Sequence, residues 1–345
     1  MYRSIRPLLF RLDPEQAHGL TLGLIRLAGA LPPVRAFLRR WFAAPQQPVQ
    51  AFGLTFSNPV GLAAGYDKDG LGWRGLAALG FGHIEVGTIT PRPQPGNPKP
   101  RIFRLPEHQA VINRMGFPSQ GAELVARRFE GRPPGGPVLG ANLGKNKVTP
   151  IEIAAQDYLC LMPVFAPLAD YLAINISSPN TAGLRRLQAR GALEDLLGQV
   201  AQERQVQAAR LGRPVPVLVK LAPDLSDDEL DDALDVLLRT RMDGVIATNT
   251  TLRREGVSGP RAGETGGLSG APLRSLSAQM VCRIYERTGG KLPVIGVGGI
   301  MNAAGAREKL DAGAVLVQVY SGMVYAGPGL VQQVLKGLSI RGSQI

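Results

Sequence analysis

The stretch Val217–Thr248, VLVKLAPDLSDDELDDALDVLLRTRMDGVIAT, contains one complete structural unit of the chain. Two short apolar runs, Val217–Leu221 and Gly244–Thr248, stand at its two ends. Between them, Ser226 and Glu229 have the spacing of a capping box, and leucines follow at helical intervals. The runs are apolar on both faces, as is typical of parallel strands covered by helices. The stretch therefore predicts a strand–helix–strand unit.

The same alternation recurs along the chain from about residue 52. Connections of helical length lie between most of the apolar runs. Eight such units predict an α/β fold, a (β/α)8 TIM barrel, with a doubly wound open sheet as the alternative. The eight runs are Val60–Ala64, His83–Ile89, Val138–Asn142, Tyr171–Ile176, Val217–Leu221, Gly244–Thr248, Pro293–Gly298 and Val315–Tyr320.

The first 45 residues differ from the rest, with seven arginines, no lysine and only Asp13 and Glu15 as acids. Asp13-Pro14-Glu15 is a good helix start, and an apolar stripe follows it as far as Leu31. Two prolines then break the pattern, and a second apolar stripe spans 34–42. We therefore expect a helical hairpin over residues 1–45, joined to a barrel domain over residues 46–345.

Composition narrows the possible functions. The chain has 345 residues, and 39 Lys and Arg against 27 Asp and Glu give a net charge of +12. This charge favours nucleic acid as a partner, but the excess is nearly all Arg and is dispersed, while aromatic residues are only 6%. We therefore expect no nucleic-acid partner.

Cys160 and Cys282 lack metal-type spacing, so we expect no metal site and a reducing compartment. No run of 18 apolar residues predicts a spanning helix.

Polar residues follow the predicted strands, where barrel enzymes keep their active sites. Asparagines and lysines there favour a small anionic ligand, and the glycines of GVGG at 296–299 favour a phosphate group. None of the three histidines directly follows a strand, and no carboxylate pair is visible. The chemistry is therefore expected to depend on a cofactor, and a phosphate-bearing flavin fits.

Two long connections interrupt the alternation. Residues 90–118 contain seven prolines, and residues 253–270 are rich in glycine and polar side chains. Long irregular segments within compact domains are usually functional, so we expect both to contribute to the site.

Ten ordered motifs resemble those of class 2 dihydroorotate dehydrogenases, a family of membrane-associated flavoenzymes of pyrimidine synthesis. The resemblance covers nearly the whole chain. It implies FMN bound on a (β/α)8 barrel and oxidation of dihydroorotate to orotate, with a membrane quinone as final acceptor. The motifs are NPVGLAAGYDKDG (58–70), GTITPRPQPGNPKPRIFRL (87–105), INRMGF (112–117), NLGKNK (142–147), INISSPNTAGLR (174–185), KLAPDLS (220–226), DGVIATNTT (243–251), TGGLSG (265–270), IGVGGI (295–300) and QVYSG (318–322).

The resemblance also implies site residues. Ser178 matches the catalytic base, and His18 and Arg104 match residues of the quinone tunnel. The implied FMN-binding residues are Ala64, Gly65, Tyr66, Asp67, Lys68, Thr88, Asn142, Asn175, Lys220, Thr248, Gly270, Gly299, Tyr320 and Ser321. The implied substrate-binding residues are Lys68, Asn113, Arg114, Met115, Gly116, Phe117, Asn175, Asn180, Asn249 and Thr250.

The implied roles are chemically coherent. Ser178 takes a proton from one ring carbon of the substrate while a hydride leaves its neighbour for flavin N5. Because a free serine is a poor base, a hydrogen bond or water chain must polarise it. Lys68 pairs with the substrate carboxylate, and Lys220 neutralises charge on the reduced flavin. Pro118 departs from the family pattern, which usually has Asn there, and a direct substrate contact at that position is in doubt.

The N-terminal hairpin and the serine base indicate class 2, since the soluble class lacks the hairpin and uses Cys as base. We expect a monomeric peripheral protein on the cytoplasmic side of the cell membrane. A rival interpretation is an FMN barrel that reduces uridines in tRNA, which needs a catalytic cysteine at the active face. Cys160 and Cys282 lie in predicted helical stretches, which disfavours it.

Overall fold

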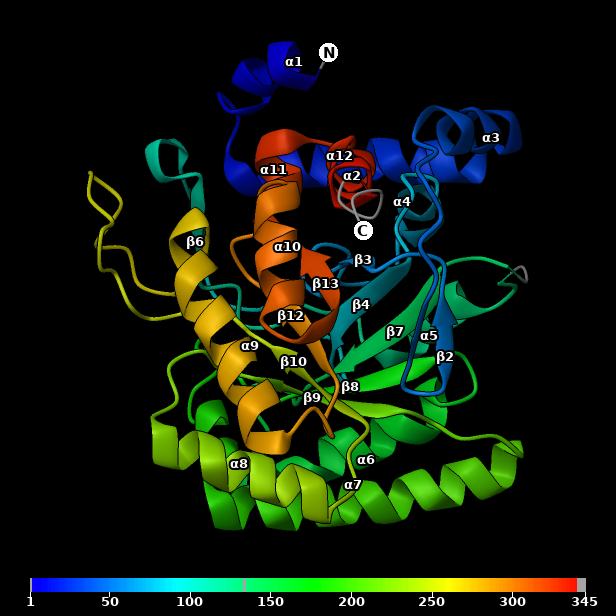
Figure 1. Cartoon of the computed structure of the whole chain (residues 1–345), viewed down its shortest axis with the longest axis vertical. Helices are drawn as coiled ribbons and strands as arrows, with labels where there is room; N and C mark the ends of the chain where they lie inside the picture. The colour runs from blue at the N-terminus through cyan, green and yellow to red at the C-terminus, as the bar shows by residue number, and fades with distance from the viewer. Residues whose placement is uncertain (1, 133–134, 340–345) are drawn as a thin grey trace.

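The computed structural model describes residues 2–132 and 135–339. Residue 1 of the predicted hairpin and residues 340–345 of the predicted barrel domain lie outside the described residues. Eight parallel strands close into a barrel (Figure 1). Each of the eight predicted runs overlaps one of them, so the predicted barrel is confirmed and the open sheet was wrong. The strands are β3 (Val60–Leu62), β4 (His83–Ile89), β7 (Val138–Leu143), β8 (Tyr171–Asn175), β9 (Val217–Leu221), β10 (Gly244–Ala247), β12 (Val294–Val297) and β13 (Ala314–Val319).

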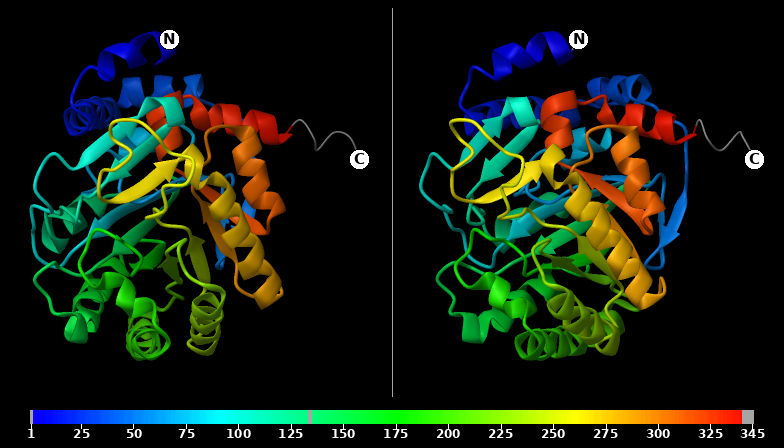
Figure 2. Two further views of the ribbon diagram at one scale, coloured as in Figure 1. Left: turned by 90° about the vertical axis from the view of Figure 1, so that its left-hand side faces the viewer. Right: turned by 60° about the vertical axis from the view of Figure 1, so that its left-hand side comes forward.

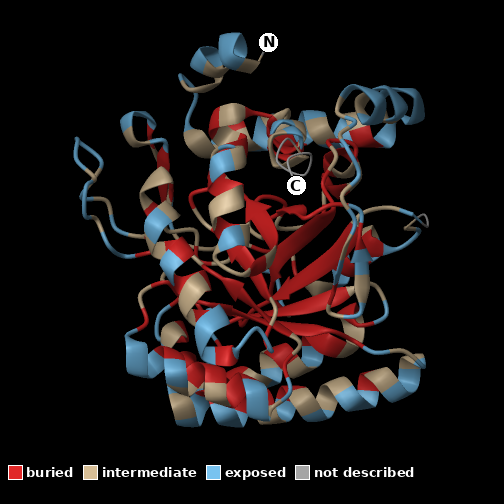
Figure 3. Cartoon of the chain, in the orientation of Figure 1, coloured by how far each residue is buried: buried red, intermediate tan, exposed pale blue. Residues whose placement is uncertain are grey.

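Helices surround the barrel and cover its strands, which are almost entirely buried (Figure 3). The capping box expected at residue 226 is present: Ser226 Oγ accepts from Glu229 N at 3.3 Å, and Glu229 Oε2 accepts from Ser226 N at 2.8 Å. The helices are α4 (Trp73–Ala77), α5 (Ala122–Phe129), α6 (Ala154–Phe165), α7 (Arg190–Leu211), α8 (Asp227–Arg239), α9 (Arg274–Thr288), α10 (Ala303–Asp311), α11 (Ser321–Ala326) and α12 (Leu330–Ser339). Four 3-10 turns are η1 (Pro106–His108), η2 (Ile151–Ile153), η3 (Leu184–Gln188) and η4 (Ala271–Leu273).

A hairpin of β1 (Val49–Ala51) and β2 (Leu54–Phe56) covers the end of the barrel where the strands begin. Phe56 is fully buried there and packs edge-on against the His83 ring, with ring centroids 5.4 Å apart. Neither nitrogen of His83 has a hydrogen-bond partner in the described chain. The opposite end of the barrel is left for the site.

The two long connections form a second sheet together. Strands β5 (Ile102–Leu105) and β6 (Ala110–Asn113) come from the proline-rich segment, and β11 (Gly267–Gly270) comes from the glycine-rich one. All pairings are antiparallel, and β6 is the central strand. The segments were expected to be irregular. This sheet was missed because β11 pairs with β6 more than 150 residues away in the chain, and the β5–β6 pair lies within a proline-rich segment.

Three helices precede the barrel: α1 (Tyr2–Leu9), α2 (Pro14–Ala30) and α3 (Pro32–Trp41). The expected helix start is present, with the Asp13 carboxylate accepting from the N–H groups of Glu15 and Gln16. The chain turns by 107° between α2 and α3, so the two predicted helices are closer to perpendicular than to an antiparallel hairpin. Helix α1 was not predicted.

Helix α2 packs closely on α4. The N-terminal helices, blue in Figure 2, lie together along one edge of the molecule. A Cβ added to Gly75 of α4 would lie 2.0 Å from Ile25 O of α2, so only glycine permits this approach. Arg101 joins the second sheet to α2 through a bidentate ion pair with Glu15, with Nη2–Oε1 at 2.7 Å and Nε–Oε2 at 3.1 Å. Within the described residues, no single helix is long and apolar enough to cross a membrane.

Candidate functional site

A pocket with an empty volume of about 980 Å³, counting its open mouth, lies where the barrel strands end. Residues at the ends of seven of the eight strands or directly after them line it, together with residues of the second sheet. The structure therefore brings together most of the residues selected from the sequence. Those in the lining are Ala64, Gly65, Lys68, Thr88, Asn113, Met115, Gly116, Phe117, Asn175, Ser178, Asn180, Lys220, Thr248, Asn249, Thr250, Gly270, Gly299, Tyr320 and Ser321.

Four of the residues selected for FMN or substrate binding do not line the pocket. The Tyr66 ring packs edge-on against Tyr320 beside it, with centroids 5.8 Å apart. The fully buried Asp67 carboxylate accepts from the N–H groups of residues 71 and 72, both at 2.8 Å, and so holds the loop that carries Lys68. Arg114 pairs with Glu264 at 2.7 Å, at the edge of the second sheet.

The fourth, Asn142, belongs to an amide network beneath the pocket. Its Oδ1 accepts from Thr88 Oγ1 at 2.6 Å and from Asn175 Nδ2 at 3.1 Å. Asn249 Nδ2 in turn donates to Asn175 Oδ1 at 3.3 Å and to Ser177 Oγ at 3.0 Å. Side chains from four different strand ends are thereby held in fixed orientations.

Glu85 is a functional candidate that sequence reasoning missed. It is fully buried within β4, and its Oε1 lies 3.6 Å from Lys220 Nζ. Its Oε2 accepts from Tyr171 OH and from Gln318 Nε2, both at 3.0 Å. Burial, followed by the charge of Glu85, raises the pKa of Tyr171, which keeps this phenol protonated. The signal was present in the sequence, as the single charged residue of the run His83–Ile89.

Lys68 and Lys220 give the pocket its charge. Lys68 Nζ donates to Gly65 O at 2.6 Å, and burial lowers the pKa of this lysine to about 8. Lys220 is buried and relies on Glu85 for charge compensation. Among the described residues that line the pocket, none is Asp or Glu. The pocket therefore favours an anionic ligand.

Ser178 presents its hydroxyl in the pocket lining and is 5% exposed. Its Oγ accepts a hydrogen bond from Asn180 N at 3.3 Å. Within the described residues no His or carboxylate hydrogen-bonds to it. Nearby in sequence, the buried Thr181 Oγ1 has no hydrogen-bond partner among the described groups. The arrangement leaves the Ser178 hydroxyl free to engage a ligand.

A glycine turn follows β12 at the pocket wall. Gly298 and Gly299 have φ of +120° and +71°. A Cβ on Gly299 would lie 2.3 Å from Arg274 Cα, so glycine is required on steric grounds as well. Backbone N–H groups that no side chain covers suit an anionic group such as phosphate. The donor set thus fits a flavin phosphate, while the amides and Lys220 fit a polar ring system.

His18 and Arg104 lie where the N-terminal helices meet the barrel. The His18 ring of α2 packs edge-on against Tyr66, with centroids 5.0 Å apart, so an aromatic contact leads from α2 to Tyr320 in the pocket lining. Burial and the nearby Lys68 charge lower the pKa of His18 to about 4. Arg104 donates to the carbonyls of Leu9 and Leu12 and lies over the Phe10 ring. Neither residue lines the pocket itself.

Sequence reasoning missed further lining residues that the tertiary structure brings in. Ser269 comes from the second sheet, and its Oγ lies 2.8 Å from Ser321 Oγ. The others come from strand ends and the loops that follow them. They are Ala63, Leu273, Ile300, Met301, Gln318 and Gly322. Val297 and Gly298, which belong to the GVGG turn selected for a phosphate, also line the pocket.

Comparison with known proteins identifies the family. The family described as "Dihydroorotate dehydrogenase" matches residues 47–341. The chain belongs to the dihydroorotate dehydrogenase family. It is 52% identical over 343 residues to the "Dihydroorotate dehydrogenase (quinone)" of Anaeromyxobacter sp. strain K, covering 98% of this chain and 92% of that one. It is 51% identical to the protein of the same name from Stenotrophomonas maltophilia, covering 99% and 97%.

Solved structures agree with this assignment. The crystal structure of DHODH from Eimeria tenella in complex with ferulenol superposes with a TM-score of 0.84 at 39% identity, covering 94% of this chain and 90% of that one. The predictions that the chain is an enzyme and a quinone-class dihydroorotate dehydrogenase are therefore confirmed.

Cys160 and Cys282 lie on the outer helices α6 and α9 and not at the pocket, unlike the cysteine that the tRNA-reducing rival requires.

Proposed function

We propose that this protein oxidises (S)-dihydroorotate to orotate, with FMN as hydride acceptor and a membrane quinone as final electron acceptor, in the de novo synthesis of pyrimidines. The observation that carries the proposal is the pocket at the strand ends, with two lysines, many amides and no acidic lining residue among those described. Such a pocket suits a substrate with a carboxylate and several carbonyl and N–H groups, and a cofactor with a phosphate. Membership of the family supports the same reaction.

The residues present fit FMN. The glycine turn at 298–299 and Ser321 would hold the phosphate, and Asn175, Thr88 and Lys220 would contact the ring. When bound, FMN supplies the hydride acceptor at N5 and passes the electrons to quinone. Lys220, compensated by Glu85, would stabilise negative charge beside the ring without reorganising, because both groups are already buried and paired.

Ser178 is proposed as the base that removes the proton from the substrate ring. Lys68 would bind the substrate carboxylate, with Asn113, Asn180, Asn249 and Thr250 holding the ring amides. Residue 117 and its neighbours approach from the proline-rich segment, where Gln94 Nε2 donates to Phe117 O at 2.7 Å. Pro118 does not line the pocket, which supports the expectation that it makes no substrate contact.

The N-terminal helices are proposed to attach the protein to the cytoplasmic face of the cell membrane as a peripheral monomer. Helices α2 and α3 expose Leu20, Leu24, Leu27, Phe37 and Trp41, the last at 62%. Arginines at 26, 35, 39 and 40 flank these side chains. An apolar face with a basic flank suits an anionic lipid surface. Quinone would then reach the flavin beside His18 and Arg104.

The absorbance spectrum of the purified protein tests the reaction. A flavin spectrum is expected that is bleached by anaerobic dihydroorotate and restored by a short-chain quinone analogue. Extraction of the cofactor and mass measurement distinguish FMN from FAD. A protein that cannot be reconstituted with FMN, or whose flavin is not reduced by dihydroorotate, would exclude the proposal.

A further inference from the structure

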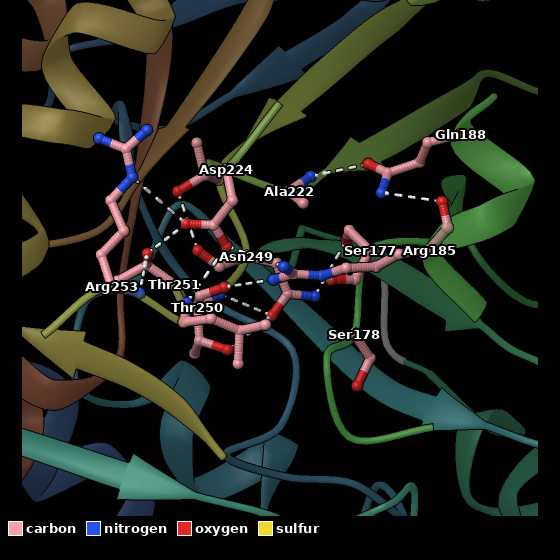
Figure 4. Close-up of polar contacts among 12 residues, drawn as sticks. Ser177, Ser178, Arg185, Gln188, Ala222, Asp224, Asn249, Thr250, Thr251 and Arg253 are labelled. Atoms are coloured by element: carbon pink, nitrogen blue, oxygen red, sulfur yellow. Dashed lines mark hydrogen bonds and ion pairs between the residues drawn. The ribbon is translucent and has the colours of Figure 1, made fainter. Parts of the chain in front are cut away.

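Arg185 joins three separate loops at the pocket end of the barrel (Figure 4). It belongs to η3, between β8 and α7. Its Nε donates to Ser177 O at 3.1 Å, its Nη2 donates to Thr250 O at 2.9 Å, and its Nη1 pairs with Asp224 Oδ2 at 2.8 Å. One side chain thus ties the loop after β8 to the loops after β9 and β10.

Two of these contacts lie at or next to a residue of the proposed chemistry. Ser177 directly precedes Ser178, so the carbonyl that Arg185 binds belongs to the peptide group leading into the proposed base. Thr250 itself lines the pocket beside Asn249. Arg185 therefore fixes the backbone of the base relative to the backbone of the substrate-binding loop.

Asp224 completes the arrangement on the far side of the guanidinium. Its carboxylate accepts from Thr251 Oγ1 and from Leu252 N, the latter at 3.2 Å. The loop after β10 is thus held both by Arg185 and by the acid with which Arg185 pairs. A second tie runs beside it, where Gln188 Oε1 accepts from Ala222 N at 2.9 Å.

Arg185 does not itself line the pocket, so any effect on chemistry must pass through the groups it holds. The contact pattern also requires arginine in particular. A planar guanidinium can direct three N–H groups at fixed angles toward two carbonyls and a carboxylate, whereas a lysine ammonium on a flexible stem cannot match all three positions.

We propose that Arg185 is a positioning residue for the proton transfer, holding the Ser178 hydroxyl at the distance from the substrate that this step requires. The inference rests on the proposed function. A displacement of a reacting group by about 1 Å can cost on the order of 10²-fold in rate. Loss of the three Arg185 contacts is therefore expected to slow catalysis strongly without removing any group from the pocket.

The test compares three variants as holoenzymes. Arg185→Gln removes the charge and the fork, and Arg185→Lys keeps the charge alone. Arg190→Gln is the matched control, because this arginine also joins two acids, Asp232 and Asp235, but on the outer helices away from the pocket. Flavin reduction by dihydroorotate is followed by anaerobic stopped flow, together with flavin content, Tm and orotate Kd.

The expected result is a fall in the reduction rate of about 10²-fold for Arg185→Gln and about tenfold for Arg185→Lys, with the Arg190→Gln rate within twofold of wild type. Flavin content is retained. The deuterium isotope effect at the ring carbon that loses its proton is expected to rise in Arg185→Gln, since a displaced base makes proton transfer more limiting. Amide hydrogen exchange is expected to increase at residues 176–181.

Three outcomes would overturn the inference. The first is reduction of the flavin at the wild-type rate by either Arg185 variant. The second is a fall in reduction rate no larger than that of Arg190→Gln. The third is a lower reduction rate with an unchanged isotope effect. If Arg185→Gln does not fold, Arg185→Lys decides. Failure of wild-type enzyme to reduce its flavin with dihydroorotate would instead reject the proposed function, so the two failures are distinguishable.

Discussion

At the scale of single residues, the pocket combines one unassisted hydroxyl with two compensated cations. Ser178 has a backbone amide as its hydrogen-bond partner in the described structure. Lys220 has Glu85, and Lys68 has a backbone carbonyl. These differences assign separate tasks to the three side chains: proton transfer for the serine, charge beside the ring for Lys220, and recognition of an anion for Lys68.

Replacing Ser178 by alanine is expected to retain the flavin and lose most of its reduction by substrate near neutral pH. General-base catalysis typically contributes about 10²–10⁴-fold, and the loss should lie in that range. Anaerobic stopped-flow absorbance measures the rate, and the flavin-to-protein ratio is the control. Reduction kinetics equal to wild type would reject Ser178 as the base.

Binding of orotate is expected to weaken as pH rises above about 8. Burial lowers the pKa of Lys68 to about 8, so the ammonium that pairs with the ligand carboxylate is present below that pH and is lost above it. Above the pKa the loss approaches about tenfold in Kd per pH unit. Calorimetric titration at pH 7 and pH 9 measures it.

The variant Lys68→Met provides the comparison for this titration. It is expected to bind orotate weakly and with the same Kd at both pH values. A wild-type Kd that does not change between pH 7 and pH 9 would assign the carboxylate to another partner.

At the scale of elements, α2 has two different faces. Leu22 and Gly29 are buried against the barrel, whereas Leu24 and Leu27 are 59% and 58% exposed. The buried face attaches the helix to α4, so the exposed face can change without loss of the fold.

The double change Leu24→Asn, Leu27→Asn is therefore expected to reduce binding to phosphatidylglycerol vesicles by about 10²-fold, since each leucine buried in lipid contributes about 1.5 kcal/mol. Vesicle sedimentation measures this, and flavin content and Tm should stay unchanged. Leu238→Asn is the control, because Leu238 is also exposed. It belongs to α8, which lies at the opposite side of the molecule from α2 (Figure 1). Equal vesicle binding by the double variant and wild type would contradict the assignment of this face.

At the scale of the whole molecule, the closed barrel separates a polar end that holds the pocket from an apolar end that holds a buried histidine. Burial lowers the pKa of His83 to about 3. Between the unfolded value of about 6.5 and pH 3, the unfolded chain binds a proton that the folded chain does not. The free energy of unfolding therefore falls as pH decreases through that window.

Replacing His83 by leucine is expected to remove this dependence. The difference in free energy of unfolding between pH 7 and pH 5 should shrink by about 2 kcal/mol, which is 1.36 kcal/mol for each pH unit below 6.5. Thermal unfolding at both pH values measures it, with the partly exposed His108→Asn as control. A variant as sensitive to acid as wild type would show that His83 does not carry the effect.

The sequence alone predicted the barrel because both of its signals are local. Each strand such as Val217–Leu221 is short and apolar on both faces, and each helix such as Asp227–Arg239 begins with its own cap. The pocket residues were selected largely through motifs at strand ends, and the family comparison supports the resemblance those motifs carry. These features depend on neighbours within a few residues.

Only the tertiary structure decided which distant groups meet. Residues tens to more than a hundred positions apart are joined by the pairing of β6 with β11, by the Glu85–Lys220 pair and by the contacts of Arg185 with Asp224 and Thr250. Likewise, the apolar stripes do not specify the 107° turn between α2 and α3 or the close packing of α2 on α4. Local patterns specify how each element forms, but burial of charges and pairing of strands depend on which surfaces the closed barrel brings together.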